Sequence, residues 1–230
     1  PVREQQQNMP KVMELRGYLS LSLETLGKWE ESLEQTQKAL ELIDPETMPV
    51  ERAILMTSLL NPMENMGRLG WVAGVCKNQI FPILEDVINN GAFPEGLTEA
   101  QVLQSYYNAK FYYYKALASQ AHPDVAKEIP GIIQQIEAKG IQNLGLQMYL
   151  LLAKSHAIRG EVGNAEQILT KTREILAKMP GINIFSLLWG EAACYLNMNL
   201  GKVDALKNLV NGLVLQGQKL NDYQVIALTK

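Results

Sequence analysis

The sequence predicts an all-α protein in which about five antiparallel helix pairs stack on one another. Apolar residues recur at helical spacing through most of the chain, and no segment keeps the alternating pattern of a strand. A second observation is a repeat, in which a glycine, an apolar residue two positions later and then a helix occur at Gly27, Gly67, Gly160 and Gly201. The first and last intervals are 40 and 41 residues long and the middle one is about twice as long, so a fifth unit with a degraded turn is expected inside it.

The clearest single element covers residues 27–45. One apolar face at helical spacing is formed by Trp29, Leu33, Leu40 and Ile43. The helix is expected to end at Asp44-Pro45, because the residue before a proline is disfavoured in the helical conformation. This segment is therefore the second helix of the first pair.

The other pairs follow from the same turn signals. The expected pairs span residues 10–45, 50–91, 97–140, 142–180 and 182–217, and residues 218–230 begin a further helix. In the third pair a long helix from Thr98 to Gln120 leads to a turn at Ala121-His122-Pro123 and a second helix that ends near Lys139. We expect one repeat domain over residues 1–230. Because the chain lacks an initiator methionine and stops within a helical pattern, we also expect it to be a piece of a longer protein.

Small residues mark where the paired helices cross. Ser20, Ala153 and Cys194 lie seven positions before a turn glycine, and Ser32 and Ala165 occupy the corresponding place in second helices. Together with Lys38-Ala39-Leu40-Glu41-Leu42 before Asp-Pro, this pattern resembles tetratricopeptide repeats, in particular the irregular, long-helix arrays found in sensor or scaffold segments of larger regulators. The resemblance implies a right-handed superhelix whose concave wall is lined by the first helix of each pair.

Three prolines depart from the repeat pattern. Pro62 lies in the first helix of the second pair, and Pro82 and Pro130 lie in second helices. A proline costs roughly 3 kcal/mol in a regular helix interior. Kinked or broken helices are expected at these positions.

The resemblance also implies a partner-binding groove on the first helices. Counting from each turn glycine places in it Tyr18, Leu21, Glu24, Leu150, Lys154, Ala157, Glu191, Tyr195 and Met198. The family's trap for a C-terminal carboxylate needs Lys and Asn at set positions, which here hold Gly17 and Leu21, then Leu150 and Lys154. Recognition of an acidic tail is therefore not expected.

A tyrosine cluster stands out in the long third-pair helix. Tyr106 and Tyr113 share one helical face, and Tyr107 and Tyr114 share an adjacent one. Packing between helices is the favoured interpretation. The alternative is an aromatic surface for a partner, because tyrosine is enriched where proteins meet.

Composition excludes several classes of function. The chain is 47% hydrophobic and 20% charged with a formal net charge of −3, so it lacks the basic patch of a nucleic-acid-binding protein. Its apolar runs are too short to span a bilayer, and its first residues do not form a signal peptide. Two cysteines are too few for a disulfide framework, which favours a cytoplasmic location.

No catalytic constellation is found in the sequence. The two histidines and two cysteines are scattered without metal-ligand spacing, and no glycine-rich phosphate loop occurs, so neither a cofactor nor a metal is expected. The favoured function is a non-enzymatic scaffold that binds a protein or peptide. The alternative is a ligand-sensing segment of a bacterial-type transcriptional or signalling regulator. Exposed apolar stripes at the two ends are expected to promote self-association.

Overall fold

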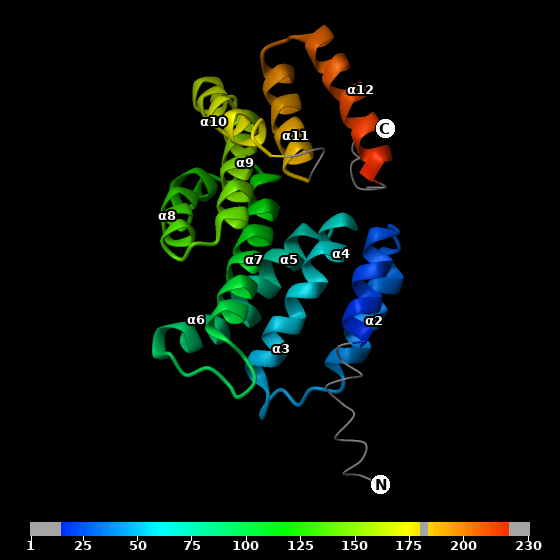
Figure 1. Cartoon of the computed structure of the whole chain (residues 1–230), viewed down its shortest axis with the longest axis vertical. Helices are drawn as coiled ribbons and strands as arrows, with labels where there is room; N and C mark the ends of the chain where they lie inside the picture. The colour runs from blue at the N-terminus through cyan, green and yellow to red at the C-terminus, as the bar shows by residue number, and fades with distance from the viewer. Residues whose placement is uncertain (1–14, 180–183, 221–230) are drawn as a thin grey trace. The chain divides into compact units, whose positions relative to one another are not determined.

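The computed structural model describes residues 15–179 and 184–220, which are helical apart from short connections (Figure 1). These residues contain no β-strand, so the prediction of an all-α protein is confirmed. The chain divides into two compact units, residues 1–113 and 114–230.

The first unit is built from short helices. It contains a helix over residues 15–25, α2 (Trp29–Leu40), α3 (Pro49–Met56), the 3-10 turn η1 (Thr57–Leu59), α4 (Leu60–Asn65), α5 (Leu69–Val75), the π-helical turn η2 (Cys76–Ile80) and α6 (Phe81–Asn90). Within it α2 contacts both α3 and α4, α3 contacts α6, and α4 contacts α5. Helix α7 (Glu99–Ala118) begins in this unit and ends in the next.

The second unit is built from longer helices. After the end of α7 it contains α8 (Asp124–Ala138), α9 (Gln142–Ile158), α10 (Val162–Leu176), α11 (Ile184–Asn199) and α12 (Val203–Leu220). Helix α9 contacts α8, α10 and α11, and α11 also contacts α10 and α12. The centre of this unit is therefore α9 and α11, the first helices of two consecutive predicted pairs.

The predicted boundaries agree with these helices to within a few residues, with two differences. Residues 218–220 belong to α12 instead of starting a further helix. Helix α2 ends at Leu40, before Asp44, and its buried residues are Ser32, Thr36, Ala39 and Leu40. Of the predicted apolar face, Leu40 and Ile43 are buried, whereas Trp29 and Leu33 are half-buried. Residues 10–14, 180–183 and 221–230 of the predicted pairs lie outside the described residues. A continuous superhelix over the chain stays a prediction.

Six helix-connecting turns share one backbone geometry. The turn residues Gly27, Gly67, Ala121, Gly140, Gly160 and Gly201 have φ angles of 70°, 74°, 54°, 73°, 74° and 64°. In each turn this residue donates its N–H to the carbonyl three positions before it, and the next residue donates to the carbonyl five positions before itself. This is the Schellman motif, which needs a left-handed residue. The degraded turn predicted at residues 121–123 is therefore the same turn with an alanine in the glycine position.

Replacing Ala121 by glycine is expected to raise the free energy of unfolding by up to about 1 kcal/mol, because alanine is strained in the left-handed region and glycine is not. The reverse change at an equivalent turn, Gly160→Ala, is expected to lower the free energy of unfolding by a similar amount. An added methyl group would meet no other atom there, so the loss would come only from the backbone strain of alanine at a φ of 74°. Urea unfolding of the two variants measures both. Equal stability of Ala121→Gly and the unmodified chain would argue against strain at this turn.

The prolines interrupt two of the three helices in which they were predicted to do so. The first helix of the second pair passes through η1 just before Pro62. The second helix of that pair passes through the π-helical η2, and α6 then restarts with Pro82 in its first turn. Pro82 cannot donate to the carbonyl of Asn78 and its ring crowds that group, which accounts for the wider turn. Helix α8 by contrast continues through Pro130.

Candidate partner-binding surface

The structure brings three of the predicted groove residues of the second unit into direct contact. The Nζ of Lys154 on α9 donates to Oε1 of Glu191 on α11 at 2.6 Å. The same Nζ lies 5.6 Å from the centre of the Tyr195 ring. The side chains of Lys154 and Glu191 are only 9% and 16% exposed. This set, called the Lys154 cluster below, joins the first helices of two consecutive predicted pairs.

The ion pair of the Lys154 cluster is nearly buried, so its charged groups are not available to bind a partner. Transferring both charges out of water is costly, and their short hydrogen bond and the aromatic face of Tyr195 offset that cost. Cys194 lies beside Tyr195 in the chain, and burial together with the charge of Glu191 raises the pKa of its thiol. The cluster therefore fixes α9 against α11, and it does not generate a reactive thiolate.

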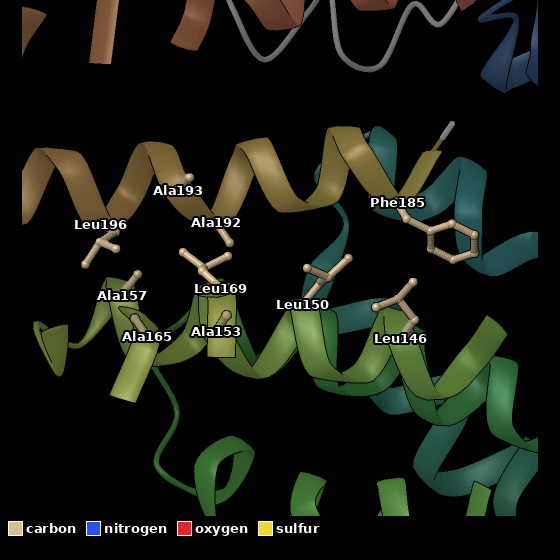
Figure 2. Packing of buried hydrophobic residues seen from close by; sticks show 10 residues of the cluster. All are labelled: Leu146, Leu150, Ala153, Ala157, Ala165, Leu169, Phe185, Ala192, Ala193 and Leu196. Atoms are coloured by element: carbon tan, nitrogen blue, oxygen red, sulfur yellow. The ribbon is translucent and has the colours of Figure 1, made fainter. Parts of the chain in front are cut away.

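Two other predicted groove residues lie in the core of the second unit. Leu150 is 1% exposed and Ala157 is not exposed at all. Figure 2 shows both side chains pointing from α9 towards α11, in one hydrophobic cluster with Leu146, Ala153, Leu169 and Leu196. They pack the interface between the two helices and do not line an open wall. Met198, one turn beyond Tyr195 on α11, is 61% exposed.

In the first unit the predicted groove residues have mixed environments. Tyr18 and Leu21 are 61% and 59% exposed. Glu24 instead points inward, where its Oε2 accepts a hydrogen bond from Nδ2 of Asn61 at 2.6 Å and its Oε1 accepts one from Oγ of Ser32 at 3.2 Å. Glu24 thus connects the helix over residues 15–25 with α2 and α4. Sequence reasoning identified Glu24 but not these partners.

The carboxyl group of Glu24 is held in an unfavourable environment for a charge. Burial raises its pKa, against the lowering effect of its hydrogen bonds to Asn61 and Ser32. Burial and the negative charges of Glu24 and Glu64 raise the pKa of the Tyr112 hydroxyl. A half-buried carboxylate with neutral hydrogen-bond donors is sensitive to pH.

The stability of the chain is expected to carry a pH-dependent contribution from Glu24. Because the folded-state pKa lies above the unfolded-state value, the folded chain binds this proton more tightly, so stability falls as pH rises from about 4 towards about 7. Glu24→Gln removes that contribution. The melting temperature of the variant minus that of the unmodified chain should therefore increase across this range.

Glu34→Gln is the matched control with the opposite sign. The hydrogen bond and charge of Lys38 lower the pKa of this exposed carboxyl group, so its contribution is present at neutral pH and is lost as pH falls below about 4. A melting-temperature difference for Glu24→Gln that does not vary with pH would contradict the proposed environment of Glu24.

The small crossing residues of the first pair form a hydroxyl cluster. Oγ of Ser20 lies 2.8 Å from Oγ of Ser32 and 2.8 Å from Oγ1 of Thr36. All three residues are almost completely buried. The sequence marked Ser20 and Ser32 as small, and the structure adds that they are also hydrogen-bonded, which satisfies buried polar groups.

The tyrosines of α7 make intramolecular contacts. Tyr107 and Tyr114 are 5% and 3% exposed. Tyr106 and Tyr113 pack edge-on against Phe81 of α6, with ring centres 6.0 and 5.4 Å apart. The hydroxyl of Tyr106 donates to Glu85 on α6 at 2.8 Å, and that of Tyr114 donates to Glu128 on α8. These contacts favour the packing interpretation over a partner surface.

Sequence reasoning missed a cation in this aromatic cluster. Nζ of Lys110 lies 4.1 Å from the centre of the Phe81 ring and 5.1 Å from that of Tyr106, and it is 3.1 Å from Oε1 of Glu85. Lys110 follows Tyr106 by four positions on α7, so the two share a helical face. The four-residue spacing could have predicted that Lys110 and Tyr106 lie close together. It could not predict that Phe81 and Glu85 of α6 contact Lys110.

The side chains of His156 and Cys76, which could in principle take part in catalysis, both contact neighbouring groups of the chain. Nδ1 of His156 lies 2.5 Å from Oε2 of Glu161, across the turn between α9 and α10. Burial raises the pKa of the Cys76 thiol to about 12. Over residues 15–179 and 184–220, no three acidic, histidine or cysteine side chains gather where a metal ion could be held. Within the same residues, none of the helices has the length and apolar character needed to cross a membrane.

No family model, curated protein or solved structure matches the chain.

Proposed function

We propose that the chain is a non-enzymatic interaction scaffold of the tetratricopeptide-like type, which binds a protein or peptide along the first helices of its pairs. The Schellman geometry shared by the five turns within the predicted helix pairs supports a repeating unit. The contact of α9 with α11 supports stacking of first helices. In this proposal both thiols remain reduced in the cytoplasm, in keeping with the free state of Cys76 and Cys194.

The observation that carries the proposal is the exposure of apolar side chains on first helices. Tyr18, Leu21 and Met198 are each about 60% exposed, although they occupy helices whose other faces are packed. Exposed apolar side chains that form a contiguous patch are typical of binding surfaces. Leu150, Lys154 and Ala157 are not part of the proposed surface, because they are buried between α9 and α11.

A peptide library selected on the intact chain tests this proposal. Substituting Met198 by glutamate is expected to weaken binding of the selected peptides about tenfold or more, because it places a charge in an apolar contact. Leu215→Glu is the matched control, since Leu215 is 60% exposed but lies on α12, a second helix.

Met198 belongs to the second unit, so this test does not involve the helix over residues 15–25. Binding that is lost with Leu215→Glu and kept with Met198→Glu would contradict the assignment to first helices. Binding that neither substitution affects would contradict it as well, since the selected peptides would then occupy another surface.

A further inference from the structure

The carboxylate of Glu24 is half-buried, and none of the described basic side chains forms an ion pair with it. It accepts hydrogen bonds only from two neutral side chains, those of Asn61 and Ser32. Three other partly shielded carboxylates each lie within 3.1 Å of a lysine or arginine nitrogen: Glu85, Glu161 and Glu191. A charge withdrawn from water is stabilised by an opposite charge, and within the described part of the chain Glu24 has none.

The two neutral donors hold the Glu24 carboxylate in one position. Its Oε1 accepts from Ser32 on α2, and its Oε2 accepts from Asn61 on α4. Nδ2 of Asn65 donates to Oδ1 of Asn61 at 3.0 Å, which fixes the amide of Asn61 in turn. A carboxylate has about four acceptor positions, so each oxygen can accept a further hydrogen bond. Glu24 is therefore preorganised for an additional donor.

The negative charges of two carboxylates act together near this site. Burial and the charges of Glu24 and Glu64 raise the pKa of the Tyr112 hydroxyl, so both carboxylates influence the same group of α7. Burial also raises the pKa of Glu24 by more than its hydrogen bonds lower it. The surroundings therefore leave the charged form of Glu24 poorly stabilised, and a cation that reaches it would be attracted.

An exposed apolar side chain lies next to Glu24 on the same helix. Leu21 precedes Glu24 by three positions, so the two are neighbours on the surface of the helix over residues 15–25. Leu21 is 59% exposed. The side chains of lysine and arginine combine an apolar stem with a charged end. An exposed leucine beside a carboxylate that has no basic partner is complementary to that combination.

We propose that Glu24 recognises a positively charged side chain, lysine or arginine, of a peptide bound along the first helices. The stem of that side chain packs on Leu21, and its charged end donates a hydrogen bond to the Glu24 carboxylate. The inference rests on the function proposed above. It adds a selectivity for basic peptides, which the exposure of apolar side chains alone does not imply.

Peptides selected from a library on the intact chain test this recognition. We expect lysine or arginine to be enriched at one peptide position. Replacing that residue by norleucine, which keeps an apolar stem and removes the charge, is expected to weaken binding about tenfold or more. Glu24→Gln should bind the basic and norleucine peptides with nearly equal affinity. Glu34→Gln is the matched control, because Glu34 already pairs with Lys38 and its loss should leave the preference unchanged.

A second variant guards against unfolding of Glu24→Gln, which melting temperatures would reveal. Leu21→Lys, at an exposed position, supplies Glu24 with a cation from the same helix and should also abolish the preference for the basic peptide. Selected peptides without an enriched basic residue would overturn the inference and leave the proposed scaffold standing. A norleucine penalty that persists in both variants would overturn it too, since the cation would then bind elsewhere. Recovery of no peptide at all would contradict the scaffold function and this inference with it.

Discussion

Replacing Lys154 by methionine is expected to lower the free energy of unfolding by about 3–5 kcal/mol, because the change leaves Glu191 as an uncompensated charge in a nearly buried site. The 2.6 Å hydrogen bond between the two side chains and their low exposure make this a different case from a surface ion pair. Urea unfolding of the intact chain measures the loss. An effect of this size would exceed that of most single substitutions.

The double variant Lys154→Met/Glu191→Leu separates the ion pair from the packing of the site. Removing both charges is expected to recover most of the lost stability, since well-packed apolar residues often replace a buried ion pair without cost. Lys28→Met is the matched control, because Lys28 and Glu31 form an exposed ion pair and its loss should change stability little. A small effect of Lys154→Met would show that Glu191 is solvated and that the cluster does not fix α9 against α11.

The turns were predictable because their backbone geometry leaves a mark on the sequence. A residue with positive φ is most often glycine, so Gly27, Gly67, Gly160 and Gly201 could be recognised directly. The fifth turn was found only from the length of the gap, since Ala121 carries no such mark. The crossing positions Ser20 and Ser32 were predictable for a similar reason, because closely packed helices require small side chains.

The environment of the groove residues was not predictable in the same way. Whether Leu150 and Ala157 are open or covered depends on how α9 is rotated against α11, and a position counted from a turn glycine does not contain that rotation. The pairing of Lys154 with Glu191 joins residues 37 positions apart and depends on the same packing. The prolines illustrate a further limit, since Pro82 accompanies a π-helical turn while Pro130 lies within an uninterrupted α8.

Truncation of Leu150 distinguishes a core residue from a groove residue. Leu150→Ala is expected to lower the free energy of unfolding by about 2–5 kcal/mol, because Leu150 is 1% exposed and its removal leaves a cavity between α9 and α11. The control Leu215→Ala, at a leucine that is 60% exposed, should cost much less, within about 0.5 kcal/mol. Urea unfolding measures both variants. If Leu150 instead lined an open groove, its truncation would weaken partner binding and leave stability nearly unchanged, and the contact between α9 and α11 shown in Figure 2 would be wrong.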